Sequence, residues 1–412
     1  MTKRKKVLFF TYDFPVPITS GGKNRAYHML KYGAKDLDVT LFSFYREVPD
    51  NDAIRAIEAL GIKNIRLFKR PLSNFKSIAQ NPFTALKNIS TVSKLANPVT
   101  SITKKLYYSP QVHAELVATI KQEKIDVVHF ESLYTAYYAT ASMDSDVVQV
   151  FGTENIESKL YYEYAKTAAK KILVPLYMLE AAKIKKDEEQ LLKVIDYTIA
   201  VSKEDADGIT QITHKPCTIV ENGVDIKTFA FKKKKAEKKN RQVLLFVGNF
   251  TYFPNITAVR NFYNQVFTHL DDRFELRIVG RDGKSLQISD PRVTCLEYVE
   301  DIRSEYYNAD IFVFPIKIGG GTNFKVVESM ACGLPIIGYA DRLTSMDIQH
   351  KQEAFFVSNG KEFIASIEKF SKDHASTEFM THRARAFVEE KYSWEVIGDR
   401  LNEYWKGLDE KN

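Results

Sequence analysis

The sequence predicts an α/β protein with two doubly wound domains, each a parallel sheet covered by helices, that face each other across a cleft. Short apolar runs typical of buried parallel strands alternate with helical patterns through both halves of the chain. The chain has 412 residues, which is too long for one compact domain of typical size. Residues 232–241 read KKKKAEKKNR, a charged stretch with the composition of a solvated linker.

Composition narrows the classes of protein to consider. The net charge of +7 is compatible with nucleic acid, an anionic lipid surface or a phosphorylated substrate, but no nucleic-acid-binding motif is present, so we expect no nucleic-acid partner. The three cysteines form no CxxC pair and no cluster with histidines, which predicts a reduced cytoplasmic protein without a structural metal or disulfide. The apolar run near the start breaks at Asp13 and Pro15, and no stretch approaches the ~20 apolar residues of a membrane span.

The first half of the chain contains strand and helix signals in alternation. The strand-like runs are residues 6–12, 39–45, 65–68, 125–130, 147–151, 195–201 and 217–220, and the helical patterns are residues 24–34, 53–60, 161–193 and 203–212. Residues 71–122 are mostly helical, with breaks at prolines, and interleave lysines with aromatic residues. This segment is either an acceptor-binding or membrane-near surface, or a solvated helical face over a core.

The loop after the first strand contains Ser20, Gly21 and Gly22 and leads into a helix. A glycine turn between a parallel strand and a helix lies at the ligand-binding edge of a doubly wound sheet. We therefore consider Gly21 and Gly22 candidate ligand-binding residues, and the alternative is a plain tight turn.

Titratable residues follow two later strands of the first half. His129 and Glu131 end the run at 125–130, and Thr153, Glu154 and Asn155 follow the run at 147–151. Such residues would line the crevice where open α/β sheets bind ligands. Glu154 is a candidate general base if its surroundings raise its pKa, or it only caps the helix that follows. His129 is interpreted as a packed strand-end histidine.

The second half repeats the alternation. Its strand-like runs are residues 243–248, 274–279, 293–296, 311–315, 336–339 and 354–357, with helical patterns at 256–267 and 324–332, from 361 onward, and at 393–408. Asn249 follows the first of these strands and is a candidate ligand-binding residue. Arg281 follows the second and is a candidate phosphate-binding cation.

The most informative stretch is FVFPIKIGGGTNFKVVESMACGLPIIG, residues 312–338. Its loop contains Gly319, Gly320, Gly321, Thr322 and Asn323. A strand, a glycine loop and a helix N-terminus together present free backbone N–H groups to an anion. Lys325 in the first helical turn opposes the helix dipole unless a phosphate shares the site, and Glu328 lies on the same face at i, i+3. The alternative is a loop that merely turns the chain, since neither a Walker A motif nor a GxGxxG fingerprint is present.

These residues resemble the nucleotide-sugar site of the retaining family 4 glycosyltransferases, which have the GT-B fold of two Rossmann-like domains. Glu328, Ala331, Gly333 and Pro335 fit the second half of the family signature, and the NGVD at 222–225 matches the family's first interdomain crossover. Gly320 stands where the usual signature has a first glutamate, but GGGTNFKVVE matches a sub-group that reads GxGT..K..E.

The resemblance implies a domain organisation. It implies an acceptor-side domain at 1–222, a nucleotide-sugar-binding domain at 223–385 that includes the linker, and a C-terminal helix at 386–412 that returns to the first domain.

The resemblance also implies roles for the candidate residues. Lys325, the N–H groups of residues 320–323 and the Gly21–Gly22 pair would stabilise the leaving diphosphate. Glu328 would hold the ribose, and residues 299–301 would meet the base. Thr153, Glu154 and Asn155 would face the sugar or the acceptor, although Glu154 replaces the histidine that relatives often carry.

The expected reaction is transfer, with retention, from a nucleotide-diphosphate sugar to a hydroxyl of a glycan or lipid-linked acceptor in surface polysaccharide or glycoconjugate synthesis. No metal or other cofactor is expected, and the location would be cytoplasmic, with possible peripheral contact to an anionic membrane. Two alternatives stay open: a catalytically silent module that binds a nucleotide sugar or a partner, and a nucleotide-sugar epimerase.

Overall fold

The computed structural model describes residues 4–71, 99–140, 146–167, 174–233, 241–250, 253–317 and 323–408. Three predicted site residues, Gly320, Gly321 and Thr322, lie outside the described residues, as do residues 234–240 of the predicted linker and most of the aromatic and basic segment at 71–122. The chain divides into two compact units, and each is described by itself. The first unit contains residues 1–220 and 398–412, and the second contains residues 221–397.

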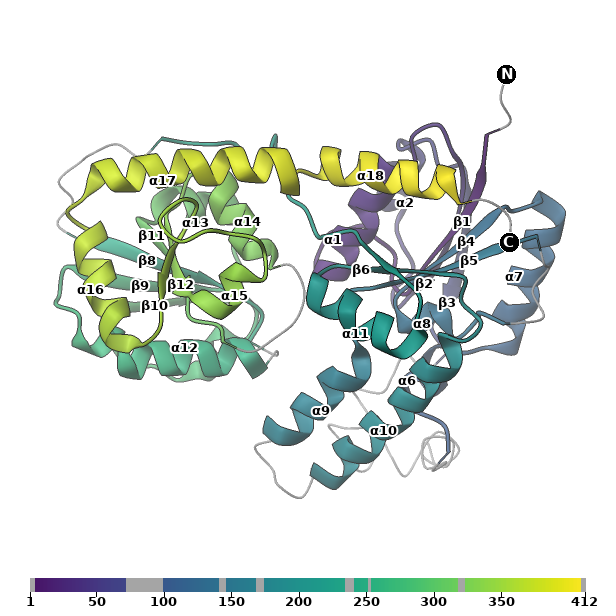
Figure 1. Cartoon of the computed structure of the whole chain (residues 1–412), viewed down its shortest axis with the longest axis horizontal. Helices are drawn as coiled ribbons and strands as arrows, with labels where there is room; N and C mark the ends of the chain where they lie inside the picture. Colours follow the sequence, from purple (N-terminus) through teal and green to yellow (C-terminus); the bar gives the residue numbers. More distant parts are fainter. Residues whose placement is uncertain are drawn as a thin grey trace. The chain divides into compact units, whose positions relative to one another are not determined.

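The first unit is a seven-stranded sheet with the order β3-β2-β1-β4-β5-β6-β7, and every neighbouring pair of strands is parallel (Figure 1). The strands are β1 (Lys6–Thr11), β2 (Asp38–Tyr45), β3 (Asn64–Lys69), β4 (Val127–Glu131), β5 (Val148–Thr153), β6 (Tyr197–Ala200) and β7 (Cys217–Ile219). The order reverses between β1 and β4, so the carboxyl ends of these two strands form the switch point where open α/β sheets bind ligands.

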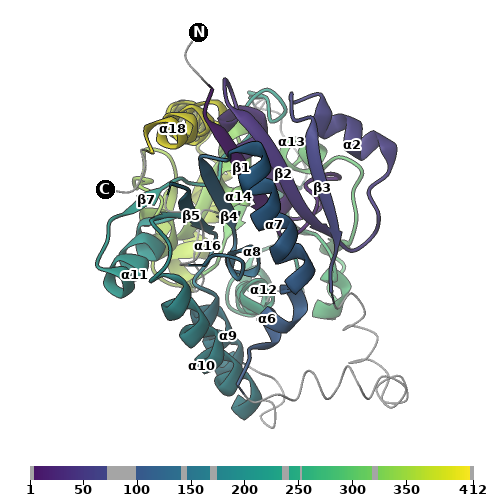
Figure 2. The same ribbon diagram turned by 90° about the vertical axis from the view of Figure 1, so that its right-hand side faces the viewer.

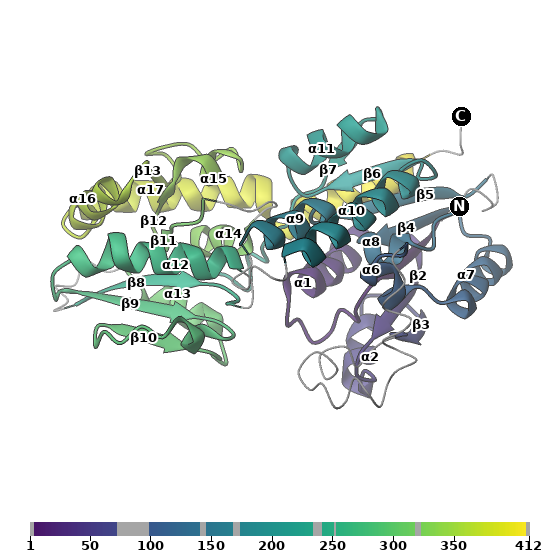
Figure 3. The ribbon, with the colours of Figure 1, turned by 90° about the horizontal axis from the view of Figure 1, so that it is seen from below.

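Helices surround this sheet. They are α1 (Gly21–His28) with a π-helical extension (Met29–Gly33), α2 (Asn51–Glu58), α6 (Ile102–Tyr107), α7 (Pro110–Glu123), α8 (Leu133–Ala136), α9 (Glu157–Thr167), α10 (Val174–Leu191) and α11 (Lys203–Thr213). Helix α7 lies over the central strands (Figure 2), and α9 and α10 run side by side (Figure 3). Among the described residues, no helix combines the length and the apolar character needed to cross a bilayer.

The central strands bury both of their faces, as the continuous apolar runs predict. Leu8 and Phe10 of β1 belong to the same hydrophobic cluster as Leu116 and Ile120 of α7. Side chains alternate along a strand, so Phe9 points to the opposite face. There Phe9 contacts Trp405 of α18 (Trp394–Gly407), with ring centroids 6.1 Å apart. Helix α18 therefore covers the face of the sheet that α7 leaves open.

The second unit is a six-stranded parallel sheet with the order β10-β9-β8-β11-β12-β13. Its strands are β8 (Gln242–Val247), β9 (Phe274–Val279), β10 (Val293–Leu296), β11 (Ile311–Phe314), β12 (Ile336–Tyr339) and β13 (Phe355–Val357). The order reverses between β8 and β11, so the carboxyl ends of these two strands form the switch point of this sheet.

Helix α12 lies on one face of this sheet, and α13 and α14 lie on the other (Figure 1). The helices are α12 (Phe253–Gln265), α13 (Ile302–Asn308), α14 (Phe324–Ala331), α15 (Ala340–Thr344), α16 (Gly360–Phe370) and α17 (His374–Phe387), with 3-10 turns at Phe267–His269 and Gly283–Leu286 and a π-helical turn at Val388–Tyr392. The predicted pattern of two doubly wound α/β sheets is confirmed.

One local prediction is wrong. The sequence places Gly21 and Gly22 in a loop before a helix that begins at residue 24, whereas α1 begins at Gly21 itself. Ser20 is the N-cap, and its side chain accepts a hydrogen bond from the Lys23 N–H. This strong N-cap residue starts the helix despite the two glycines. The glycine pair therefore forms the first turn of α1, where backbone N–H groups have no partner within the helix.

Candidate active site

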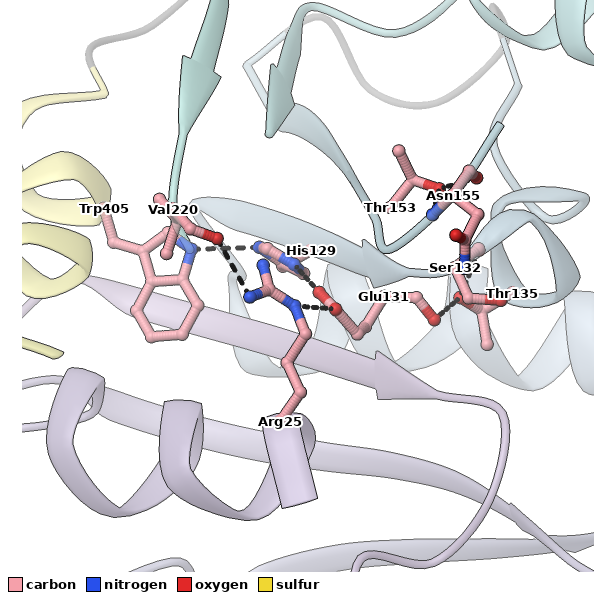
Figure 4. Close-up of polar contacts among 9 residues, drawn as sticks. All are labelled: Arg25, His129, Glu131, Ser132, Thr135, Thr153, Asn155, Val220 and Trp405. Atoms are coloured by element: carbon pink, nitrogen blue, oxygen red, sulfur yellow. Dashed lines mark hydrogen bonds and ion pairs between the residues drawn. The ribbon is translucent and has the colours of Figure 1, made fainter. Parts of the chain in front are cut away.

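A buried ion pair lies at the switch point of the first unit. Arg25 of α1 donates from Nε to Glu131 Oε1 at 2.7 Å and from a terminal nitrogen to the carbonyl of Val220 at 2.9 Å (Figure 4). Burial alone would raise the pKa of Glu131, but the Arg25 charge and the hydrogen bond with His129 lower that pKa to about 2. Glu131 is therefore an ionised structural carboxylate.

His129 lies behind this pair, and its environment defines its tautomer. The indole N–H of Trp405, which can only donate, points at His129 Nδ1 at 3.1 Å. His129 Nδ1 must therefore accept, and the imidazole proton is on Nε2, which lies 2.7 Å from Glu131 Oε2. His129 is fully buried and stacks on Phe9. The interpretation of His129 as a packed strand-end histidine is confirmed.

Two backbone features bring these side chains together. A β-carbon on Gly152 of β5 would overlap Glu131 and lie 2.7 Å from His129 Nε2, so only glycine leaves room for this pair. Ser132, directly after Glu131, has a φ of 91°, a region that L-residues rarely adopt. Such strained backbone is concentrated at functional sites.

Glu154 lies beside the first turn of α1. A β-carbon on Gly22 would overlap the Tyr12 hydroxyl and lie 2.9 Å from Glu154 Oε1, so Gly22 permits a close approach of both groups. Burial raises the pKa of Glu154 to about 7, with the Arg25 charge opposing the rise and the Glu131 charge adding to it. Glu154 can therefore exchange a proton near neutral pH, which is the property that a general base needs.

Thr153 and Asn155 form a local turn around Glu154. The Thr153 hydroxyl donates to the Asn155 carbonyl at 2.5 Å and accepts from the Asn155 N–H at 3.3 Å. The Thr153 side chain is thus engaged with the backbone of Asn155 (Figure 4). These bonds hold the turn that contains Glu154.

At the N-terminus of α9, a carboxylate accepts a hydrogen bond from a backbone N–H group. Its first helical hydrogen bond runs from Leu160 N–H to the Ile156 carbonyl, and the Ser158 N–H donates to Glu188 at 3.4 Å. Glu188, on α10, is the carboxylate that receives this N–H group.

The sequence analysis missed a cluster of tyrosines and a carboxylate that lies near Glu154. Tyr134 of α8 donates from its hydroxyl to Glu157 at 3.2 Å, and its ring packs against Tyr12 and Tyr107. Burial and the neighbouring Glu188 raise the pKa of Glu157 to about 8. The available signal was Tyr12 at the end of one apolar run and Tyr134 shortly after another, but that they lie close together follows only from the strand order.

In the second unit, Lys325 lies in the first turn of α14, as predicted. Its ammonium donates to Asn255 Oδ1 at 2.8 Å and lies 4.7 Å from the ring centre of Phe246. Burial lowers the pKa of Lys325 to about 7, although Glu328 opposes this shift. A cation held in such a position is poorly solvated, so a bound anion would stabilise its charged form.

Glu328 lies one turn further along α14 and accepts a hydrogen bond from the Tyr306 hydroxyl at 2.7 Å. Burial raises the pKa of Glu328, while Tyr306 and Lys325 oppose the rise. A carboxylate that is fixed by a buried tyrosine keeps one oxygen available to accept from a ligand hydroxyl.

Asn249 and Arg281 contribute to this site in different ways. The Asn249 carbonyl accepts from Asn255 Nδ2 at 2.8 Å, so the turn after β8 orients the residue that holds Lys325. Gly280, with a φ of 139°, brings its backbone against Gly248 and fixes this turn. The Arg281 side chain is exposed, and the backbone carbonyl of Arg281 accepts a hydrogen bond from the Phe250 N–H.

Asn323 begins the described chain after the glycine loop and occupies the N-cap position of α14, where its carbonyl accepts from the Val326 N–H at 2.9 Å. Within the described parts of the chain, no group of three or more histidine, cysteine or acidic residues has the arrangement of a metal site.

Two doubly wound sheets with polar residues gathered at both switch points define a two-domain, Rossmann-like α/β protein. Residues 19–228, just over half of the chain, match the model described as Glycosyltransferase Family 4, and residues 241–373 match the model described as Glycosyl transferases group 1. The chain therefore belongs to glycosyltransferase family 4, which confirms the family that the sequence motifs predict.

Among curated proteins, a 113-residue region is 30% identical to the capsular polysaccharide biosynthesis glycosyltransferase CapM of Staphylococcus aureus. This region covers 27% of the chain and 30% of CapM, so the chain matches less than a third of that relative's length.

Solved structures are similar over nearly the whole chain. HepE from Anabaena, in complex with UDP-glucose, has a TM-score of 0.67 at 14% identity, covering 98% of this chain and 100% of HepE. Sucrose-phosphate synthase from Thermosynechococcus elongatus has a TM-score of 0.68 at 14% identity, covering 98% of both chains. These likenesses show the fold, and the predicted GT-B architecture of two Rossmann-like domains is confirmed.

Proposed function

We propose that the protein transfers a sugar from a nucleotide-diphosphate sugar to a hydroxyl of a glycan or lipid-linked acceptor, with retention and without a metal. The observation that carries the proposal is Lys325, a partly buried cation at a helix N-terminus on the switch point of the second unit. Anions bind at helix N-termini because the first N–H groups have no partner within the helix. The complex of HepE with UDP-glucose supports a nucleotide sugar as the ligand.

The leaving diphosphate gains negative charge in the transition state, and fixed positive groups stabilise that charge. Lys325 would supply the cation, and the N–H groups of residues 320–323 and of the Gly21–Gly22 turn would supply hydrogen bonds. Glu328 would accept from the ribose hydroxyls. The exposed Arg281 side chain would supply a second cation.

On the acceptor side, Glu154 would remove the proton from the attacking hydroxyl. A carboxyl group with a pKa of about 7 is half ionised at neutral pH and returns the proton readily. Thr153 would hold the turn, and Asn155 would face the sugar or the acceptor. The similarity to CapM and to WaaG, a glycosyltransferase of lipopolysaccharide biosynthesis, supports a surface polysaccharide or glycoconjugate as the product. Peripheral contact with an anionic membrane stays a prediction.

The test is calorimetry and turnover with UDP, GDP, dTDP and ADP sugars, followed by transfer assays with sugar acceptors in the presence and absence of EDTA. Donor binding and product formation unaffected by EDTA would support the proposal. The absence of nucleotide-sugar binding would contradict it.

A second candidate is a catalytically silent module that binds a nucleotide sugar or a partner. Gly320 and Glu154 favour it, because the related signatures carry a glutamate and a histidine at these positions. Donor binding without hydrolysis or transfer would support this candidate. Product formation from the donor alone would instead indicate an epimerase.

A further inference from the structure

Helix α18 contributes a hydrogen bond to the network behind the candidate acceptor side. Trp405 is fully buried, and its N–H donates to His129. Asn402 of the same helix donates to the Gly33 carbonyl at 2.7 Å, so the helix is fixed against the chain that follows α1. The C-terminal segment is thus joined to the strand-end network by both packing and hydrogen bonds.

The hydrogen bonds run in sequence from Trp405 through His129 and Glu131 to Arg25. Because Trp405 can only donate, His129 presents its Nε2 proton to Glu131. Glu131 has its other oxygen on Arg25. Breaking the first contact would leave the buried His129 Nδ1 without a donor, and the alternative tautomer would place a lone pair against the Glu131 carboxylate. Either result weakens the support of Arg25 by Glu131.

Arg25 links the network to the candidate site. It lies on α1 one turn after Gly21 and Gly22, and the same guanidinium reaches Val220 at the end of the first unit's main segment. Because Arg25 lies one helical turn after Gly21, a guanidinium fixed at two points restrains the first turn of α1. That turn lies against Tyr12 and Glu154.

We propose that Trp405 and His129 are positioning residues for the transfer reaction, which hold the Glu131 carboxylate on Arg25 and so hold the Gly21–Gly22 turn beside Glu154. The inference rests on the proposed function, because it assigns a task at the acceptor side of the same site. Neither residue touches the reacting atoms. Their contribution is to keep the glycine N–H groups and Glu154 in one geometry, and catalysis is sensitive to displacements of about 1 Å.

The experiment compares Trp405→Phe, which keeps an aromatic ring but loses the N–H, with Trp394→Phe. Trp394 is the only other tryptophan of the chain, is equally buried, and lies in the second unit. We expect Trp405→Phe to lower kcat about tenfold with an unchanged donor KM, because the donor phosphates would be held by Lys325. Trp394→Phe should leave kcat unchanged. Equal kcat values for the two variants would overturn the proposal.

A rescue experiment separates positioning from packing. In His129→Gln, the amide can still donate to Glu131, whereas His129→Leu has a side chain that can neither donate nor accept. We expect His129→Gln to retain most of the turnover and His129→Leu to lose about tenfold more. If the two variants are equal, the hydrogen bond to Glu131 has no role in the reaction.

Two readouts do not depend on turnover. In ¹⁵N-histidine spectra, the resonances lost in His129→Gln should show a protonated Nε2 and an unprotonated Nδ1 at pH 7, and the opposite tautomer would overturn the network. Hydrogen exchange of the α1 amides should be about tenfold faster in Trp405→Phe than in Trp394→Phe. If wild-type protein transfers no sugar, the proposed function fails, and equal exchange rates in the two variants would still refute the positioning of α1.

Discussion

The two switch points carry charge in opposite ways. In the first unit, Glu131 and Arg25 neutralise each other in a fully buried pair, and the pKa of Glu131 falls to about 2. In the second unit, Lys325 has an amide oxygen as its hydrogen-bond partner, and burial lowers its pKa to about 7. A charge that is hydrogen-bonded to a buried counter-ion is already stabilised in the folded protein. Lys325 has a neutral amide as its hydrogen-bond partner, and Glu328 offsets only part of the effect of burial, so a bound anion would stabilise its charge further. The difference separates structural charges from candidate ligand-binding charges.

Glu154 sharpens the comparison within the first unit. It shares the strand-end region with Glu131, but the Arg25 charge only moderates the effect of burial, and the pKa of Glu154 rises to about 7. Two carboxyl groups of one sheet edge thus differ by several pKa units because one of them is paired with the guanidinium. Such separated pKa values are typical of residues with different tasks.

The largest effect is expected from Glu131→Gln. The substitution removes the carboxylate charge that faces Arg25 Nε, and removal of one partner of a buried pair costs about 3–5 kcal/mol of unfolding free energy. Urea unfolding at pH 7 measures this difference. The control is Asp399→Asn, which breaks the exposed pair with Lys35 and should cost less than about 1 kcal/mol.

The contribution of the Glu131–Arg25 pair to the unfolding free energy should depend on pH. The pKa of Glu131 is lower in the folded protein than its ordinary value of 4.5, so the stability from the pair is present above about pH 4.5. It is lost as the pH falls from about 4.5 to about 2. The wild type and Glu131→Gln should therefore converge at low pH, and a constant difference between them would mean that Glu131 is not ionised in the pair.

Lys325→Met should lower kcat/KM by about 100- to 1,000-fold, as expected for the loss of one charge-stabilising donor. Methionine retains much of the apolar volume against Phe246, so the fold should persist. Steady-state kinetics with the donor varied measures the loss, and circular dichroism checks the fold. Lys369→Met on the exposed face of α16 is the control. Unchanged turnover in Lys325→Met would show that Lys325 is as structural as Glu131.

Glu154→Gln should lower kcat by about 100-fold, because a neutral amide cannot accept the proton of the acceptor hydroxyl. In the wild type, kcat should rise with pH through about 7 as Glu154 loses its proton, and the variant should lack this rise. A pH profile of transfer measures both. Glu58→Gln, at an exposed position of α2, is the control. A retained rise near pH 7 in Glu154→Gln would assign the titration to another group, such as Glu157.

The sequence predicts the sheets well because their signals are local. Apolar runs of strand length and the helical patterns between them define the order of elements, and the glycine loop places Lys325 on a helix N-terminus. The partners of these residues are not local. Trp405 reaches His129 across 276 positions, and Asn255 reaches Lys325 across 70. No periodicity reports such pairs, because they depend on strand order.

The start of α1 at Gly21 was mispredicted for a local reason. Glycine lowers helix propensity, so the two glycines predict a loop, but the Ser20 N-cap and the packing of Arg25 outweigh that penalty. Tyr12 and Tyr134 were likewise not chosen as candidates, because single tyrosines after apolar runs are indistinguishable from core residues until the neighbouring strands are known.

The smallest effect is a pH dependence of donor binding. Lys325 loses its proton near pH 7 in the free protein, and a bound diphosphate should raise its pKa, so binding above pH 7 must take up a proton. The affinity for UDP should fall by at most about tenfold per pH unit between pH 7 and 9. Calorimetry in two buffers of different ionisation enthalpy counts the protons, and up to one should be taken up at pH 8. Lys325→Arg is the matched control, because a guanidinium stays charged throughout this range and should bind UDP with no proton uptake. Equal proton uptake by the wild type and Lys325→Arg would mean that Lys325 is already charged in the free protein. The contrast between structural and candidate ligand-binding charges would then rest on Glu131 and Glu154 of the first unit alone.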